Sequence, residues 1–402
     1  MFIHIITKFD ILIIRGVIFL KKLIWLIIFF LICTTKVYAT NDANVIKNAK
    51  SGVLMDASTG TLLYEKDKDK KVAVASMTKM VTQILILENI ESGNLSWDEE
   101  VTASSNASGM GGSQIYLETG EKMTVKELMK GITMASANDA TVAMAERLAG
   151  TEENFVKLMN QKVKELGLKN TNFVNSTGLD ENNHYSSAYD MALIAKELLS
   201  HEQILEFSSL YEDYLRVNTQ NKFWLVNTNK LVRFYEGADG LKTGFTDNAG
   251  YCMAVTAKRD NMRLIAIVLG EETGKQRNAE TMELLDYGFN LYKVDLVRSK
   301  DDEVGSIKLD KANKEKISIY PKEDITVLGK KSEASLNYDV ELDLYDVNLP
   351  LKKNEVVGKI LVKNGNKIVS EVDAVVIEDI DSLGFFKLLI NIFKSVLTGQ
   401  LK

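Results

Sequence analysis

Two long apolar runs near residue 260 predict a pair of neighbouring strands. Residues 252–257 and 262–270 consist mainly of Val, Ile, Leu, Ala and Met, and the polar residues 258–261 separate them. Such runs joined by a short polar turn are typical of an antiparallel hairpin. Residues 76–88 instead have helix-forming character, with no Gly or Pro before Gly93. Residues 131–146 read as a helix end, a break and a new helix.

These patterns predict a mixed domain over about residues 45–291. We expect an antiparallel sheet with helices packed on it and a mostly helical subdomain inserted around residues 82–200. After about residue 294 the pattern changes to short alternating runs at 318–320, 324–328, 340–345 and 359–362, with turns such as 363–366 between them. This second pattern predicts a small all-β domain without catalytic residues.

The two ends of the chain have their own patterns. A basic stretch, an apolar run over residues 23–33 and small residues before Thr40 are typical of a secretory signal peptide cleaved after Ala39; the alternative is an uncleaved membrane anchor. Residues 383–402 place apolar side chains on one face and lysines on the other, and the run is too interrupted to span a bilayer. It predicts a helix in the membrane interface, the alternative being a helix packed on protein. We therefore expect a signal peptide (1–39), a catalytic domain (40–291), an all-β domain (292–381) and an amphipathic helix (382–402).

Charge and cysteine content exclude several functions. The chain has 49 Lys and Arg against 55 Asp and Glu. Removal of residues 1–39, with five basic residues and one acidic residue, leaves 44 against 54, which argues against nucleic-acid binding. It also leaves Cys252 as the only thiol, so no internal disulfide is expected and Cys252 is interpreted as a buried apolar residue. No His-x-x-x-His, Cys pair or EF-hand loop is present, and we expect no metal or cofactor.

The first candidate for chemistry is Ser76, followed three residues later by Lys79. On a helix these two side chains share one face, and a serine at a helix start lies near the positive end of the helix dipole. A serine hydroxyl needs a nearby base, and Lys79 can serve if burial and a second cation disfavour its charge. The alternative is a helix-capping serine and a solvated lysine. A Ser-His-Asp triad is poorly supported, because the chain has only three histidines.

Two further motifs follow in the chain. Ser136-Ala137-Asn138 offers a proton relay and an amide for contacts with Lys79 and substrate; the alternative is that Ser136 or Asn138 is an ordinary helix N-cap. Lys242-Thr243-Gly244 precedes the predicted hairpin. Lys242 would supply positive charge at the sheet edge, and Gly244 would let a ligand backbone approach closely; the alternative is a loop with a surface lysine. Each motif alone is weak evidence for a catalytic site, and their occurrence in this order strengthens that evidence.

With these motifs the chain resembles the serine D-alanyl-D-alanine carboxypeptidases, the low-molecular-mass penicillin-binding proteins. Residues 171–179, 186–192 and 227–231 are also similar to that family, and the resemblance covers about residues 45–380. One departure is Val74, where the family usually has proline, which puts the rigidity of the turn before Ser76 in doubt.

The resemblance implies an α+β fold of the penicillin-binding transpeptidase and β-lactamase type, followed by the all-β domain and the C-terminal helix. It implies that Ser76 is acylated, Lys79 is the base, and Ser136 and Asn138 bridge to substrate. Lys242, Thr243 and Arg277 would bind the terminal carboxylate, and the backbone N–H groups of Ser76 and Phe245 would form the oxyanion hole.

The implied substrate is a peptidoglycan stem peptide ending in D-Ala-D-Ala. β-Lactams would acylate the same serine, and the enzyme would act outside the cytoplasmic membrane, anchored by its C-terminal helix. Other outcomes on this site are a DD-endopeptidase, a β-lactamase or a penicillin-binding sensor with little turnover. No Glu-x-x-Leu-Asn-like loop occurs between Asn138 and Lys242, which argues against a class A β-lactamase. The intact motif set argues against a sensor.

Overall fold

The computed structural model describes residues 44–309, 311–333 and 338–384. The expected signal peptide (1–39) and residues 385–402 of the expected amphipathic helix lie outside the described residues. Within the described ranges, no helix has both the length and the apolar character needed to cross a bilayer.

A five-stranded antiparallel sheet forms the first part of the fold. Its strand order is β2-β1-β9-β8-β7, with β2 at one edge and β7 at the other. The strands are β1 (Ser51–Asp56), β2 (Leu62–Lys66), β7 (Ala238–Thr246), β8 (Gly250–Arg259) and β9 (Met262–Glu271). The predicted hairpin is confirmed as β8 and β9. The first strand of the described residues, β1, pairs with β9, which follows it about 200 residues later in the chain.

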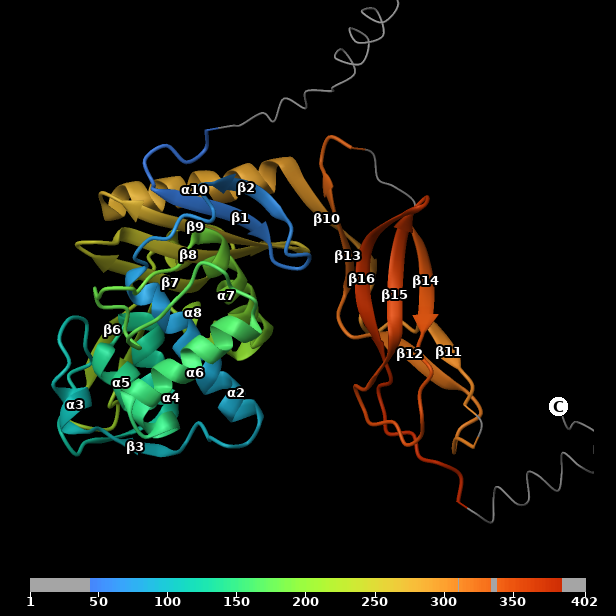
Figure 1. Ribbon diagram of the computed structural model, residues 1–402, viewed down its shortest axis with the longest axis horizontal. Coiled ribbons are helices and arrows are strands. Elements are labelled where there is room, and N and C mark those ends of the chain that lie inside the picture. The colour runs from blue at the N-terminus through green and yellow to red at the C-terminus, as the bar shows by residue number, and fades with distance from the viewer. Residues whose placement is uncertain (1–43, 310, 334–337, 385–402) are drawn as a thin grey trace, which may run out of the picture. The chain divides into compact units, whose positions relative to one another are not determined.

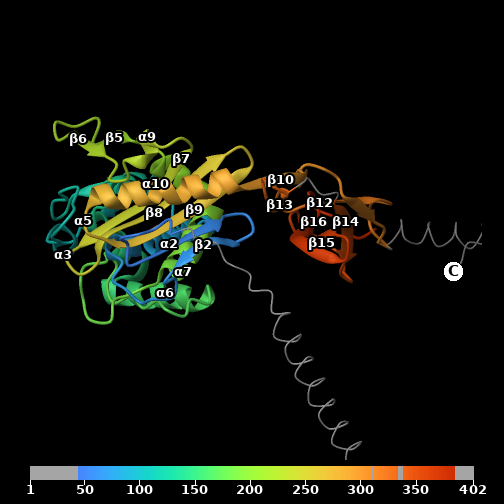
Figure 2. The same ribbon diagram turned by 90° about the horizontal axis from the view of Figure 1, so that it is seen from above.

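Alternation along the central strands gives the sheet two apolar faces. Leu264, Ala266 and Val268 of β9 pack with Leu284 and Leu285 of α10 (Gly274–Leu291). The residues between them in β9 belong to the core formed with the other helices. Because successive strand side chains point to opposite faces, one strand serves both cores. Figures 1 and 2 show α10 along one face and the helical region against the other.

The helical region confirms the predicted insertion. It contains η1 (Ala75–Thr78), α2 (Lys79–Glu91), β3 (Glu100–Thr102), α3 (Ser105–Ser108), β4 (Lys122–Thr124), α4 (Val125–Lys130), η2 (Gly131–Ala135), α5 (Asn138–Ala149), α6 (Glu152–Glu165) and α7 (Ala188–Ser200). Short elements then lead back to the sheet: η3 (Glu202–Ile204), α8 (Leu205–Ser208), β5 (Glu212–Leu215), β6 (Phe223–Val226) and α9 (Leu231–Phe234). Thr124, Thr151 and Ser187 cap α4, α6 and α7 with side-chain hydrogen bonds.

The remaining strands form an all-β region with a core of its own. They are β10 (Tyr292–Arg298), β11 (Gly305–Ile307), β12 (Ile317–Pro321), β13 (Ile325–Lys330), β14 (Asp339–Leu344), β15 (Val356–Asn364) and β16 (Lys367–Val375). β10 pairs with β13, and the other five form a sheet in the order β11-β12-β16-β15-β14. The four predicted strands are confirmed as β12 to β15, whereas β10, β11 and β16 were not predicted. The fold is therefore an α+β domain followed by an all-β domain.

Candidate active site

Ser76 and Lys79 meet at the start of α2. Ser76 lies in the 3₁₀ turn η1, which runs directly into the helix, and Lys79 Nζ is 2.8 Å from Ser76 Oγ. Lys79 is fully buried and also donates a hydrogen bond to the carbonyl oxygen of Thr177 at 2.7 Å. The prediction that the two side chains share one face is confirmed. The alternative of a solvated lysine is wrong, because the Lys79 side chain is fully buried.

The environment of Lys79 favours its neutral form. Burial is the main cause that holds its pKa well below the ordinary value, and the positive charge of Lys242 adds to the effect. The carboxylate of Asp139 acts in the opposite direction and only partly offsets them. An unprotonated amine within hydrogen-bond distance of a serine hydroxyl can accept its proton.

Ser136 and Asn138 lie where a π-helical turn, η2, gives way to α5. Ser136 has φ 61° and ψ 31°, a left-handed conformation that is costly for a non-glycine residue. Neither residue is the N-cap of α5, since Ala137 occupies that position without a side-chain hydrogen bond. The helix-cap alternative is therefore wrong. The junction packs against α2, which begins at Lys79 directly after the turn that carries Ser76.

Within the described residues, the side-chain amide of Asn138 is hydrogen-bonded through only one of its two polar atoms. Its Nδ2 donates to the carbonyl oxygen of Gly111 at 2.6 Å, and this contact fixes the orientation of the amide. Its Oδ1 is buried and has no hydrogen-bond partner among the described residues. A buried acceptor without a partner is costly unless a ligand supplies the donor. Asn138 Oδ1 is thus poised to accept a hydrogen bond from a bound molecule.

Asp139 is a site residue that the motif analysis missed. Its carboxylate accepts hydrogen bonds from the backbone N–H groups of Ile115 and Leu117, at 3.1 and 2.9 Å. The backbone N–H of Asn138 also donates to the carbonyl oxygen of Ser113. These contacts hold the loop over residues 111–117 against the start of α5. An acidic residue beside a motif, followed by an apolar helix, is the sequence signal that could have indicated this role.

The third motif lies on the edge strand β7 and forms a buried cationic site. Lys242 is 1% exposed, so the alternative of a surface lysine is wrong. Burial, and next the charge of Arg277, lower the pKa of Lys242 to about 7. Arg277, in α10, is itself largely buried. Thr243 Oγ1 donates to Thr228 Oγ1 at 2.8 Å. Two buried cations that repel each other form a site that an anion would stabilise.

Gly244 makes a close contact within the chain itself. A Cβ atom at this position would lie 2.8 Å from the carbonyl oxygen of Val74, 3.0 Å from Ala75 Cβ and 3.1 Å from the backbone nitrogen of Ser76. This close approach is made by the chain's own turn before the nucleophile, and the approach of a ligand backbone stays a prediction. This contact also supports that turn, which lacks the expected proline. The next residue, Phe245, is 51% exposed, and its ring lies 4.3 Å from the ring of Tyr251.

The folded chain brings the three motifs together at one site. Gly244 contacts the turn that holds Ser76, the charges of Lys242 and Asp139 act on Lys79, and Arg277 acts on Lys242. A nucleophile, a neutral amine and an anion-binding site together suit acyl transfer to a substrate with a carboxylate near the scissile bond. Cys252 is buried and its pKa is raised to about 11 by burial, as expected of an apolar residue rather than a nucleophile.

Comparisons with known proteins agree with this geometry. Residues 37–273 match the family Peptidase_S11, D-alanyl-D-alanine carboxypeptidase, and residues 292–382 match the C-terminal domain of penicillin-binding protein 5. D-alanyl-D-alanine carboxypeptidase DacF of Bacillus subtilis is 47% identical over 342 residues, which cover 85% of this chain and 88% of that protein.

Solved structures show the same similarity. Penicillin-binding protein 5 of Haemophilus influenzae is 31% identical with a TM-score of 0.65, covering 83% of this chain and 98% of the other. Penicillin-binding protein D2 of Listeria monocytogenes in the ampicillin-bound form is 35% identical with a TM-score of 0.54, covering 60% and 97%. The chain belongs to the D-alanyl-D-alanine carboxypeptidase family, peptidase family S11.

Proposed function

We propose that this protein is a serine DD-carboxypeptidase, which removes the terminal D-alanine from peptidoglycan stem peptides. The observation that carries the proposal is the 2.8 Å contact between Ser76 Oγ and the buried Nζ of Lys79. The relatives' names support the substrate class. This pair supplies a nucleophile and its base without a histidine.

In the first step, Ser76 Oγ attacks the carbonyl carbon of the penultimate D-alanine while Lys79 Nζ takes the hydroxyl proton. The backbone N–H groups of Ser76 and Phe245 are the proposed donors to the developing oxyanion. Collapse of the tetrahedral intermediate breaks the peptide bond. The leaving amine takes a proton relayed through Ser136, and free D-alanine departs. Water then attacks the ester carbonyl while Lys79 takes its proton; the bond to Ser76 Oγ breaks, Lys79 returns the proton to Oγ, and the shortened peptide is released.

The terminal carboxylate of the substrate is assigned to Lys242, Thr243 and Arg277. A carboxylate there would relieve the repulsion between the two buried cations, and it would raise the pKa of Lys242. Asn138 would accept a hydrogen bond from Lys79 or from the substrate amide through its unpartnered Oδ1. These contacts would place the scissile carbonyl near Ser76.

β-Lactams are the second proposed ligand class, because they present a carboxylate beside a strained acyl group. The ampicillin-bound form of a related protein supports this assignment. We also propose export with a signal peptide over residues 1–39, a catalytic domain over 40–291, an all-β domain over 292–381, and attachment to the outer face of the cytoplasmic membrane through residues 382–402. These assignments rest on the sequence pattern.

The deciding experiment follows D-alanine release from a peptide ending in Lys-D-Ala-D-Ala, with Ser76→Ala as the control. Release by the wild-type protein and its loss in the variant would establish the activity. A crosslinked dimer of stem peptides, offered in parallel, tests for endopeptidase activity. Stable labelling of Ser76 by a penicillin without release of D-alanine would contradict the proposal and favour a sensor.

A further inference from the structure

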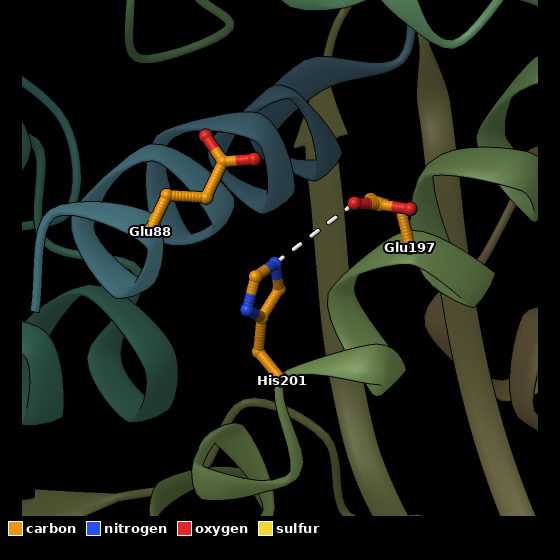
Figure 3. Close-up of side chains that lie close together, drawn as sticks. All are labelled: Glu88, Glu197 and His201. Atoms are coloured by element: carbon orange, nitrogen blue, oxygen red, sulfur yellow. Dashed lines mark ion pairs between the residues drawn. The ribbon is translucent and has the colours of Figure 1, made fainter. Parts of the chain in front are cut away.

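A second cluster of titratable side chains lies where α2 and α7 end. Glu88 is in the last turn of α2, Glu197 is in the last turn of α7, and His201 follows the end of α7 directly. One ligand atom from each, two carboxylate oxygens and an imidazole nitrogen, all lie within 4.8 Å of one another. Figure 3 shows the three side chains converging from the two helices. The proposed reaction uses none of them.

His201 is oriented as a metal-binding histidine would be. Its side chain is 9% exposed, and its Nδ1 is 2.8 Å from a carboxylate oxygen of Glu91. If Nδ1–H donates to Glu91, the lone pair of Nε2 faces the cluster. Nε2 is buried and has no hydrogen-bond partner within the described part of the chain. Its separation from Glu197 Oε1, 4.0 Å, is too long for a hydrogen bond but suits two atoms bound to a common ion (Figure 3). A carboxylate behind a ligating histidine is the usual second partner.

The local electrostatics favour a cation at this place. Helix C-termini carry partial negative charge, which basic residues in the last turn commonly offset. Neither α2 nor α7 has a basic residue in its last turn, and both have glutamates there. Lys162 supplies one nearby charge, donating to Glu88 Oε1 at 2.7 Å, and it also contacts Glu165. Lys162 would compete for one oxygen of Glu88, and among the described residues it pairs with neither Glu197 nor His201.

We propose that Glu88, Glu197 and His201 bind a divalent transition-metal ion, with Zn²⁺ the best fit to one imidazole and two carboxylates. Tetrahedral zinc with bonds of about 2.0–2.1 Å places its ligand atoms about 3.3 Å apart. The 4.0 Å between His201 Nε2 and Glu197 Oε1 must therefore contract by about 0.7 Å, and the widest spacing, within 4.8 Å, by up to about 1.5 Å, which rotation of the partly exposed carboxylates can supply. A water molecule would complete the coordination. A search for pairs of His or Cys passes over this site, because it contains one histidine and two glutamates.

The ion would act as a clamp between two helices. Glu88 belongs to the helix whose opposite end carries Lys79, and the rise of 1.5 Å per residue puts Glu88 about 14 Å along the axis from Lys79. The metal therefore does not touch the reacting atoms. It would hold the far end of the nucleophile helix against α7, and an ion that binds only the folded state stabilises that state.

The competing explanation is a protonated His201 that bridges Glu91 and Glu197 with no metal. Titration of the full-length chain with ZnCl₂ in a calorimeter separates the two. The chain is purified without a polyhistidine tag, which would itself bind zinc, and is treated with EDTA and dialysed first. Bound Co²⁺, as a second probe, would give the intense visible absorption of a tetrahedral site.

We expect one Zn²⁺ per chain and a rise in the unfolding temperature that EDTA reverses. His201→Gln and Glu197→Gln should each weaken zinc binding by at least tenfold. Glu197 is partly exposed, so its variant still tests the proposal if substitution of the buried His201 impairs folding. His184→Gln is the matched control, because His184 lies elsewhere and contacts Thr78; it should bind zinc as the wild type does. No binding by the wild type, or unchanged binding by both site variants, would overturn the proposal.

Discussion

Substitution of Gly244 by alanine tests the link between β7 and the nucleophile. The added Cβ would lie 2.8 Å from the Val74 carbonyl oxygen, whereas ordinary contacts begin at 3.4 Å. The strand and the turn must therefore separate by about 0.6 Å. A misplacement of about 1 Å can cost 10²-fold in rate, so we expect acylation of Ser76 to slow by roughly 10- to 100-fold. Overpacking of this kind costs about 1–3 kcal/mol of unfolding free energy.

The assay is the rate of labelling by a fluorescent penicillin, with urea unfolding measured on the same samples. Gly329→Ala is the matched control, because a Cβ on Gly329, also in a strand, meets nothing within 4 Å. It should acylate within about twofold of the wild type. In Gly244→Ala, the further change Ala75→Gly removes one clashing atom and suits a residue with φ 48°, so it should restore part of the rate. A folded Gly244→Ala protein that acylates at the wild-type rate would refute the reasoning.

Three further predictions concern ionisable groups. Lys79→Ala should reduce acylation about 10²- to 10⁴-fold while unfolding stays cooperative, and near-normal labelling would exclude Lys79 as the base. Since the pKa of Lys242 is about 7, KM for a D-Ala-D-Ala peptide should rise as pH increases through 7, because the substrate carboxylate then loses its cationic partner. Lys242→Arg should flatten this rise in KM. An equally steep rise in KM for the variant would argue against the assignment of Lys242. His184 has its pKa lowered to about 4 from 6.5, mainly by burial, so the unfolded chain binds the proton first and stability should fall by up to about 3 kcal/mol as pH drops from 6.5 to 4. Urea unfolding of the wild type and of His184→Gln across that pH range measures this loss of stability. Parallel curves of unfolding free energy against pH would contradict the prediction.

Local patterns in the sequence predicted much of the catalytic part of the fold. The apolar runs before and after Lys258 gave the β8–β9 hairpin, and the spacing of Ser76 and Lys79 placed both on one face. These predictions depend on neighbours along the chain, which periodicity records well. The short strand β11 and the edge pairing of β10 with β13 depend on distant partners, and their few residues show little alternation of their own.

The site was predicted in its residues but not in its contacts. The left-handed conformation of Ser136 and the bond from Lys79 to the Thr177 carbonyl are set by segments that meet only after folding. Every residue has a backbone carbonyl, so no sequence motif could indicate the contact of Lys79 with the Thr177 carbonyl. Gly244 shows the same limit, since its close contact with the turn at Val74 depends on a segment about 170 residues earlier in the chain.

The position of β1 between β2 and β9 has a consequence for the order of folding. The hairpin of β1 and β2 leaves one edge of β1 unpaired until β9 is present, about 200 residues later in synthesis. Exposed edges invite association with other chains, and contacts of such sequence separation form slowly. Because β7 also precedes β9, Lys242 cannot be locked into the sheet before the last central strand arrives. A partly synthesised chain therefore holds Ser76 and Lys79 without the strand that completes the site, and hydrolytic competence should appear late, together with the closed sheet.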